Sequence, residues 1–160
     1  MNLELINSSP ANLAPAKVSK ELEIQLLLEW AGTKILSLPI QKPKPKSYLN
    51  NWPDYFYDYF PNSFSGSGLR PESPNNLEID LIDEILTLVL LISNPLSRKI
   101  IQSRLLINPI TLKHIYTWSK ISQLLNLSPY VIKNQYQLGI NQIIKNSNPA
   151  KIKSFLSKIN

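Results

Sequence analysis

The chain of 160 residues contains no cysteine and a single histidine, His114. It can therefore form neither disulfides nor thiolate metal sites, and one imidazole is too few for a paired-histidine zinc site. The longest apolar run, 85–92, is far shorter than the roughly 20 residues that a bilayer requires. The N-terminus carries Glu4 and lacks the basic flank of a signal peptide. We therefore expect a cytoplasmic protein with no metal or other cofactor and no membrane segment.

Carboxylate side chains are absent from the whole C-terminal half. Up to Glu84 the chain holds seven Lys or Arg beside all eleven Asp and Glu, a formal charge of −4. From Ile85 onward it holds ten Lys or Arg and no carboxylate side chain, a formal charge of +10. The overall charge of +6 conceals this division. A half-chain whose charged side chains are all positive favours a polyanionic partner such as DNA.

Alternating strand patterns of useful length are also absent, so we predict an all-α fold. Residues 1–17 are expected to be flexible, and 18–74 to form an N-terminal helix followed by a connector rich in proline and aromatic residues. Residues 75–160 are expected to form a helical DNA-binding domain. Its predicted helices are 75–92, which should be the buried spine, then 95–108, 111–125, 128–145 and 149–158.

The segment 117–144 has the pattern of a helix-turn-helix. Thr117 can cap a first helix in which Ile121, Leu124 and Leu125 face inward. Asn126 stands where the turn needs a left-handed residue, four positions after the small residue Ser122. Ser128 can cap the second helix, and Pro129 can take its first position. Ile132 should then be the residue of the second helix that packs inward. The departure is Gln135, which falls where an apolar inward residue is expected.

If this motif binds DNA, the N-terminal turns of the second helix should enter the major groove. Amides can pair with adenine and lysine with guanine; the candidate base-reading residues are Tyr130, Lys133, Asn134 and Gln137. A second set could contact phosphates; its members are Lys113, His114, Thr117, Lys120, Lys145, Lys151 and Lys153.

Two other clusters favour structural interpretations. The carboxylates of Glu78, Asp80, Asp83 and Glu84 could hold a divalent ion, but we favour stabilisation of a helix N-terminus or pairing with the basic half. His114 lacks a local carboxylate, so we predict no catalytic residue and no enzymatic activity.

The aromatic segment 52–60 could stack on the bases of single-stranded nucleic acid. We favour a role in packing over base stacking. The alternative is that the segment forms a surface for a protein partner.

Several short motifs resemble an uncharacterised family of prophage and gene-transfer-agent-type helix-turn-helix proteins. They are Trp52-Pro53-Asp54, Arg70-Pro71-Glu72-Ser73-Pro74, the run 79–86 (IDLIDEIL), Trp118-Ser119-Lys120-Ile121 and Gly139-Ile140. The likeness covers about 30–144 and implies a phage-type helix-turn-helix protein. The terminal motif is also similar to the promoter-reading region of sigma factors and to small terminase DNA-binding domains.

These patterns together predict a non-catalytic protein that binds double-stranded DNA as a phage-derived regulator of transcription. One alternative is a small terminase-like packaging subunit, which would assemble into a ring. Another is a protein–protein adaptor that uses the acidic and aromatic N-terminal half. The sequence is compatible with self-association as a dimer or higher oligomer.

Overall fold

The computed structural model describes residues 19–38 and 71–159, and all structural statements concern these residues. They form six helices, which include 72% of the described residues, and no strand. The helices are α1 (Lys20–Ile35), α3 (Asn76–Leu90), α4 (Pro95–Leu105), α5 (Trp118–Leu125), α6 (Pro129–Asn146) and α7 (Pro149–Ile159). The predicted all-α class is confirmed. The predicted flexible N-terminus lies outside the described residues, as does the part of the predicted proline- and aromatic-rich connector in 39–70, which includes the aromatic segment 52–60.

The helix starts are set by side-chain caps that the sequence signals. Ser19 accepts a hydrogen bond from the Leu22 amide at the start of α1. Asn75 forms a capping box with Glu78 at the start of α3, and Asn94 caps α4 with Pro95 in the first turn. Such caps satisfy amides that a helix start otherwise leaves without partners. The predicted starts of α3 and α4 are therefore confirmed.

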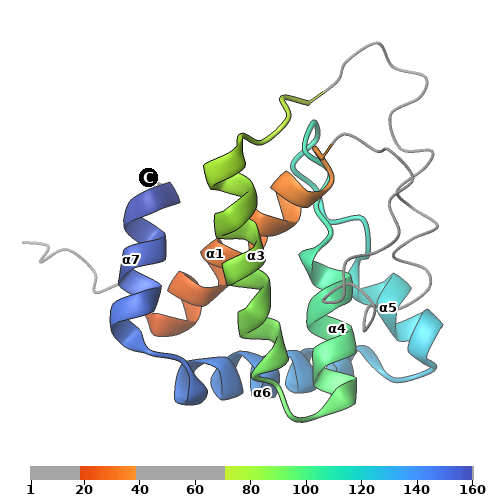
Figure 1. Cartoon of the computed structure of the whole chain (residues 1–160). Helices are drawn as coiled ribbons and strands as arrows, with labels where there is room; N and C mark the ends of the chain where they lie inside the picture. The colour runs from red at the N-terminus through yellow and green to blue at the C-terminus, as the bar shows by residue number, and fades with distance from the viewer. Residues whose placement is uncertain (1–18, 39–70, 160) are drawn as a thin grey trace, which may run out of the picture.

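The helices pack around one hydrophobic core to which α1 also contributes. In Figure 1, α6 runs across the lower end of α3 and α4, with α5 near one end and α7 near the other. Helix α6 packs on α1, α4 and α5, and α1 also packs on α3 and α7. The fully buried side chains include Leu27, Ile85, Ile92, Ile100, Ile132 and Ile140. Buried apolar side chains from both described segments thus stabilise a common core.

Helix α3 provides the expected buried spine through one apolar face. Leu81, Ile82, Ile85 and Leu88 are buried along it. Its second half is not buried all round, because Leu90 is 44% exposed. The carboxylate of Glu78 at its start pairs with Lys34 of α1 at 2.7 Å.

Two glycines allow helices to approach closely. A Cβ at Gly139 of α6 would lie 2.5 Å from Cδ1 of Ile101 on α4. A Cβ at Gly32 of α1 would lie 1.7 Å from the backbone oxygen of Leu105 at the end of α4. Both helices therefore pack against α4 at distances that a larger residue would prevent.

The predicted helix 111–125 is wrong in its first half. Residues 106–117 form an irregular loop with an isolated antiparallel bridge between Ile107 and His114. The Asn108 side chain accepts hydrogen bonds from the amides of Ile110 and Thr111, and Leu112 has a φ of 55°. This side chain gives residues 108–111 an alternative to helical bonding, and α5 begins only at Trp118. Helix α4 ends at Leu105, before the predicted end at 108, because Leu106 has an extended backbone.

Candidate nucleic-acid interface

The turn between α5 and α6 has the predicted geometry. Asn126 ends α5 in the left-handed region, with φ 52° and ψ 44°. The Leu127 amide donates to the Ser122 carbonyl at 3.1 Å, and the Ser122 hydroxyl donates back to the Leu127 carbonyl. Ser128 then caps α6 by accepting from the Val131 amide. These bonds connect the two helices through a short turn.

Helix α5 is attached to the core through a narrow apolar stripe. Ile121 is 1% exposed and Ile132 of α6 is fully buried, as predicted. The predicted inward position of Leu124 is wrong, because its side chain is 50% exposed. Since α5 packs chiefly on α6, only the side with Ile121, Trp118 and Leu125 finds apolar neighbours.

Gln135, the departure from the apolar pattern, has polar partners on α4. Its Oε1 accepts hydrogen bonds from Asn94 Nδ2 at 3.2 Å and from the Ser97 hydroxyl at 2.9 Å. Ser97 itself is fully buried. The amide of Gln135 thereby satisfies polar groups at the start of α4, and an apolar residue at this position could not do so.

Aromatic and cationic side chains strengthen the contact between α5 and α6. The rings of Trp118 and Tyr136 meet edge to face, with centroids 5.2 Å apart. The Arg104 guanidinium lies 4.2 Å from the Trp118 ring centroid and donates to the Tyr116 carbonyl at 3.0 Å. Because of these two contacts, Arg104 is occupied within the protein. Burial also raises the pKa of Tyr136 to about 12.

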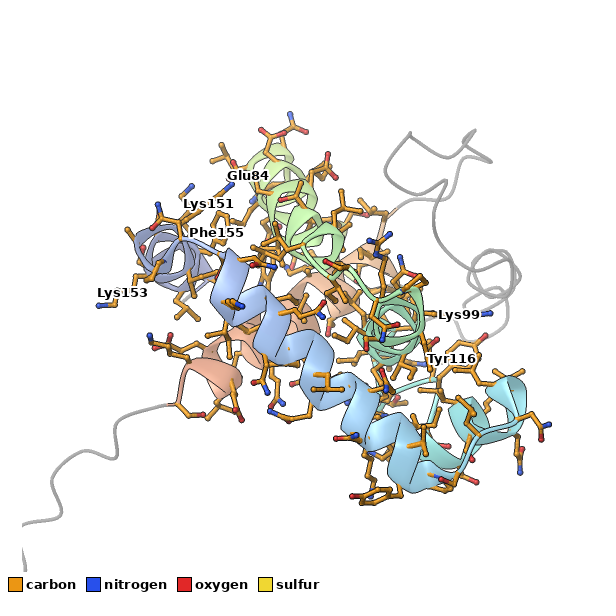
Figure 2. The ribbon with its side chains drawn as sticks, turned by 90° about the horizontal axis from the view of Figure 1, so that it is seen from below. Glu84, Lys99, Tyr116, Lys151, Lys153 and Phe155 are labelled. Carbon is orange, nitrogen blue, oxygen red and sulfur yellow. The ribbon has the colours of Figure 1, made fainter. Side chains whose placement is uncertain are left out.

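The outer side of α6 carries the predicted base-reading residues. Tyr130 is 80% exposed, Lys133 and Asn134 are exposed, and Gln137 is half-buried. Viewed from below in Figure 2, α6 lies in front of α3 and α4, and no described helix covers its outer face. The helix contains Lys133 and Lys145 but no carboxylate. Its exposed face can therefore approach an anionic surface without carboxylate repulsion from its own residues.

The predicted phosphate-contacting residues fall into two groups at opposite ends of α6. Lys113, Thr117 and Lys120 belong to α5 or the loop before it. Lys145 lies near the end of α6, and Figure 2 shows Lys151 and Lys153 on α7, at the end away from α5. Tyr130 and Lys145 are 15 positions apart, about 23 Å along a helix. The two groups therefore do not form one compact site.

Individual members of these groups are also engaged within the fold. The Thr117 hydroxyl caps α5 by accepting from the Lys120 amide, and Lys120 Nζ lies 4.6 Å from the Tyr116 ring centroid. On α7, Lys151 Nζ lies 3.7 Å from a carboxylate oxygen of Glu84. Lys113 and Lys120 remain exposed near the start of α5.

His114 points into the protein. Its Nδ1 lies 2.8 Å from the Arg104 carbonyl oxygen, and its Nε2 lies 3.8 Å from a carboxylate oxygen of Glu29. Burial, with Arg104 nearby, lowers the pKa of His114 below its ordinary value of 6.5. A neutral, engaged imidazole adds no positive charge for a phosphate, so we leave His114 out of the interface.

Asn141 is an exposed residue of this face that the sequence reasoning missed. It lies seven positions after Asn134, and residues seven apart share one side of a helix. This seven-residue spacing from Asn134 is the sequence signal that identifies Asn141 as part of the same face. Leu138, 44% exposed, lies between them in the sequence.

Among the described residues, no group of three or more Asp, Glu or His side chains could hold a metal ion. None of the described helices is long and apolar enough to cross a membrane. Comparison with protein-family models, with curated proteins and with solved structures gives no match to this chain.

Proposed function

We propose that this chain is a non-catalytic, cytoplasmic protein that binds double-stranded DNA through α5, the turn at Asn126, and the outer face of α6. The observation that carries the proposal is the outer face of α6, which is exposed and free of carboxylates. Helices presented in this way by a preceding helix and a tight turn enter the major groove by their first turns. The amides of Asn134 and Gln137 then reach base edges.

Phosphate contacts would come from the cations nearest to the start of α6. Lys113 and Lys120 are exposed beside α5. Lys133, which the sequence offers as a base reader, lies next to Asn134 and is counted here as a phosphate contact. Each phosphate that they neutralise releases counterions, which makes affinity depend on salt. Lys145 in the last turn of α6, and Lys151 and Lys153 on α7, belong to a separate region, and the proposal does not need them.

A salt titration of binding to a random duplex tests this assignment. Contacts by Lys113, Lys120 and Lys133 predict a slope of about −3 for log K against log salt between about 50 and 200 mM. Participation of Lys145, Lys151 and Lys153 as well would steepen the slope to about −5. Fluorescence anisotropy of a labelled duplex gives this slope directly. A flat response, or no binding at low salt, would contradict DNA binding.

A pair of matched charge reversals locates the surface. Lys133→Glu places a negative charge on the outer face of α6. Lys153→Glu makes the same change at an exposed lysine of α7. We expect the first to weaken binding at least about tenfold and the second to change it by much less. Equal effects would show that α6 is not the contacting helix.

The proposed biological role is regulation of transcription by a phage-derived protein. It rests on the resemblance to prophage-type helix-turn-helix proteins given by the sequence motifs. Light scattering of the purified protein separates this role from a packaging role. A monomer or dimer is expected, and a stable ring-sized assembly would argue against the regulator.

A further inference from the structure

The amide side chains of α6 divide into two sets with different surroundings. The inward set is hydrogen-bonded within the fold: Gln135 to Asn94 and Ser97, and Gln142 to the Ser93 amide at 2.9 Å. The exposed Asn146, at the end of α6, also donates to the Leu91 carbonyl at 3.2 Å. The outward set comprises Asn134, Gln137 and Asn141, which make no hydrogen bond with any described residue. The inward amides fix how α6 sits on the corner between α3 and α4, and this fixes which side the outward amides occupy.

The outward amides follow one line along the helix. Spacings of three and four residues place Gln137 about 4.5 Å, and Asn141 about 10.5 Å, beyond Asn134 along the axis. Successive base pairs are about 3.4 Å apart along DNA. Neighbouring amides on this line are therefore spaced to meet neighbouring or next-neighbouring base pairs.

Guanine-selective donors are scarce on the same face. Arginine pairs with guanine through two parallel hydrogen bonds, but both arginines of the described residues are used internally. Arg98 Nε donates to the Ile92 carbonyl at 3.1 Å, and Arg104 lies against Trp118. Lys133 is the only cation in the first two turns of α6. Apart from Lys133, which can itself pair with guanine, the candidate base-reading donors on this face are amides, whose bidentate partner in the major groove is adenine.

An aromatic side chain stands at the start of the line. Tyr130 is 80% exposed directly after Pro129, in the first turn of α6. In the major groove, thymine differs from cytosine by a methyl group that apolar side chains contact. Tyr130 therefore adds an apolar surface where the amides supply hydrogen bonds, and both features suit an A·T base pair.

From these placements we infer that α6 selects A·T base pairs in the major groove, with Asn134 and Gln137 as the main readers and Asn141 extending the site. This inference rests on the proposed DNA binding and adds the class of sequence that is bound. It also makes major-groove edges the source of selectivity, as distinct from the narrow minor groove of A·T-rich DNA.

Three duplexes with identical flanks and different central base pairs distinguish selectivity from major-groove edges from selectivity for the minor groove. One has an A·T core, one a G·C core, and one an inosine·cytosine core. The inosine·cytosine pair presents the major-groove acceptors of guanine but lacks the minor-groove amino group of guanine. We expect the A·T core to bind at least about tenfold more tightly than the other two at the same salt concentration. Equal binding of the A·T and inosine·cytosine cores would overturn the inference and leave DNA binding intact.

The variant Asn134→Ala/Gln137→Ala assigns the effect to its residues. Asn76→Ala is the matched control, because Asn76 is an exposed amide on α3, outside the proposed DNA-binding surface. The double variant should bind all three cores with similar affinity, while the control keeps the preference for A·T. A preference that survives in the double variant would overturn the assignment. If the unmodified protein bound none of the three cores, the proposed function itself would be refuted. Circular dichroism confirms that each variant is folded.

Discussion

The Ser97 hydroxyl of α4 donates a hydrogen bond to Oε1 of Gln135 on α6 across 2.9 Å. This bond lies at the contact where Gly139 of α6 also approaches α4. The polar pair and the glycine together position α6 so that Asn134 and its neighbours face outward. The orientation of the proposed DNA-binding face thus depends on a buried contact on the opposite side of the same helix.

Replacing Gln135 with leucine should destabilise the protein, although the change restores an apolar pattern. The hydroxyl of fully buried Ser97 loses its acceptor, which costs about 1–3 kcal/mol. Adding Ser97→Ala should recover part of the loss, because the orphaned donor is then removed. Urea unfolding of the two single variants and the double variant measures this coupling. Additive losses would show that the bond contributes nothing.

Asn126→Ala should lower the free energy of unfolding by about 1 kcal/mol or more, since φ is 52° at this position. Asn126→Gly should preserve or raise stability, because glycine adopts a left-handed conformation at little cost. Thermal unfolding of both variants provides the comparison. If alanine and glycine had the same effect, the left-handed turn would not be present in solution.

The two glycine contacts predict a ranked pair of variants. Gly139→Ala should cost about 1–3 kcal/mol, because the terminal methyl of Ile101 can move away from the new Cβ. Gly32→Ala should cost more, since the new Cβ would meet the backbone oxygen of Leu105. Ile101→Val should relieve the first variant and leave the second unchanged. Urea unfolding tests the order, and a reversed ranking would contradict the packing of α1 on α4.

The lowered pKa of His114 predicts that stability falls as the pH drops below 6.5. The unfolded chain binds a proton at an ordinary histidine pKa, while the folded chain resists protonation until a lower pH. The free energy of unfolding therefore decreases from pH 6.5 down to the folded pKa, and this contribution is constant above 6.5. His114→Asn should flatten the pH profile over this interval. An unchanged profile would place the pH dependence elsewhere.

Local sequence features were sufficient to predict the caps and the turn of the α5–α6 region, but not the extent of the first helix or the exposure of Leu124. Thr117 and Ser128 accept hydrogen bonds from the amides of Lys120 and Val131, and Pro129 fixes φ at its own position. Asn126 tolerates a left-handed backbone by itself. Such signals do not depend on the rest of the fold. For the same reason the start of α4 at Asn94-Pro95 could be placed correctly.

Features that depend on distant partners could not be predicted. The roles of Gln135 and Gln142 depend on residues 38 to 49 positions away in the sequence. The loop 106–117 is closed by pairing between Ile107 and His114, which apolar periodicity does not reveal. The inward placement of His114 depends likewise on Glu29 of α1. Its position among lysines in the sequence suggested a phosphate contact for a side chain that the fold directs inward.

Chemical-shift mapping by NMR tests the central claim most directly. A duplex with an A·T core, about two helical turns long, is added to the ¹⁵N-labelled protein, and backbone amide shifts are followed along the chain. We predict the largest changes at the start of α5, at the turn around Asn126, and along the outer face of α6 from Tyr130 to Asn141. Helix α7 should change little. Shifts concentrated on α7 or α3, or no shifts at all, would contradict the account.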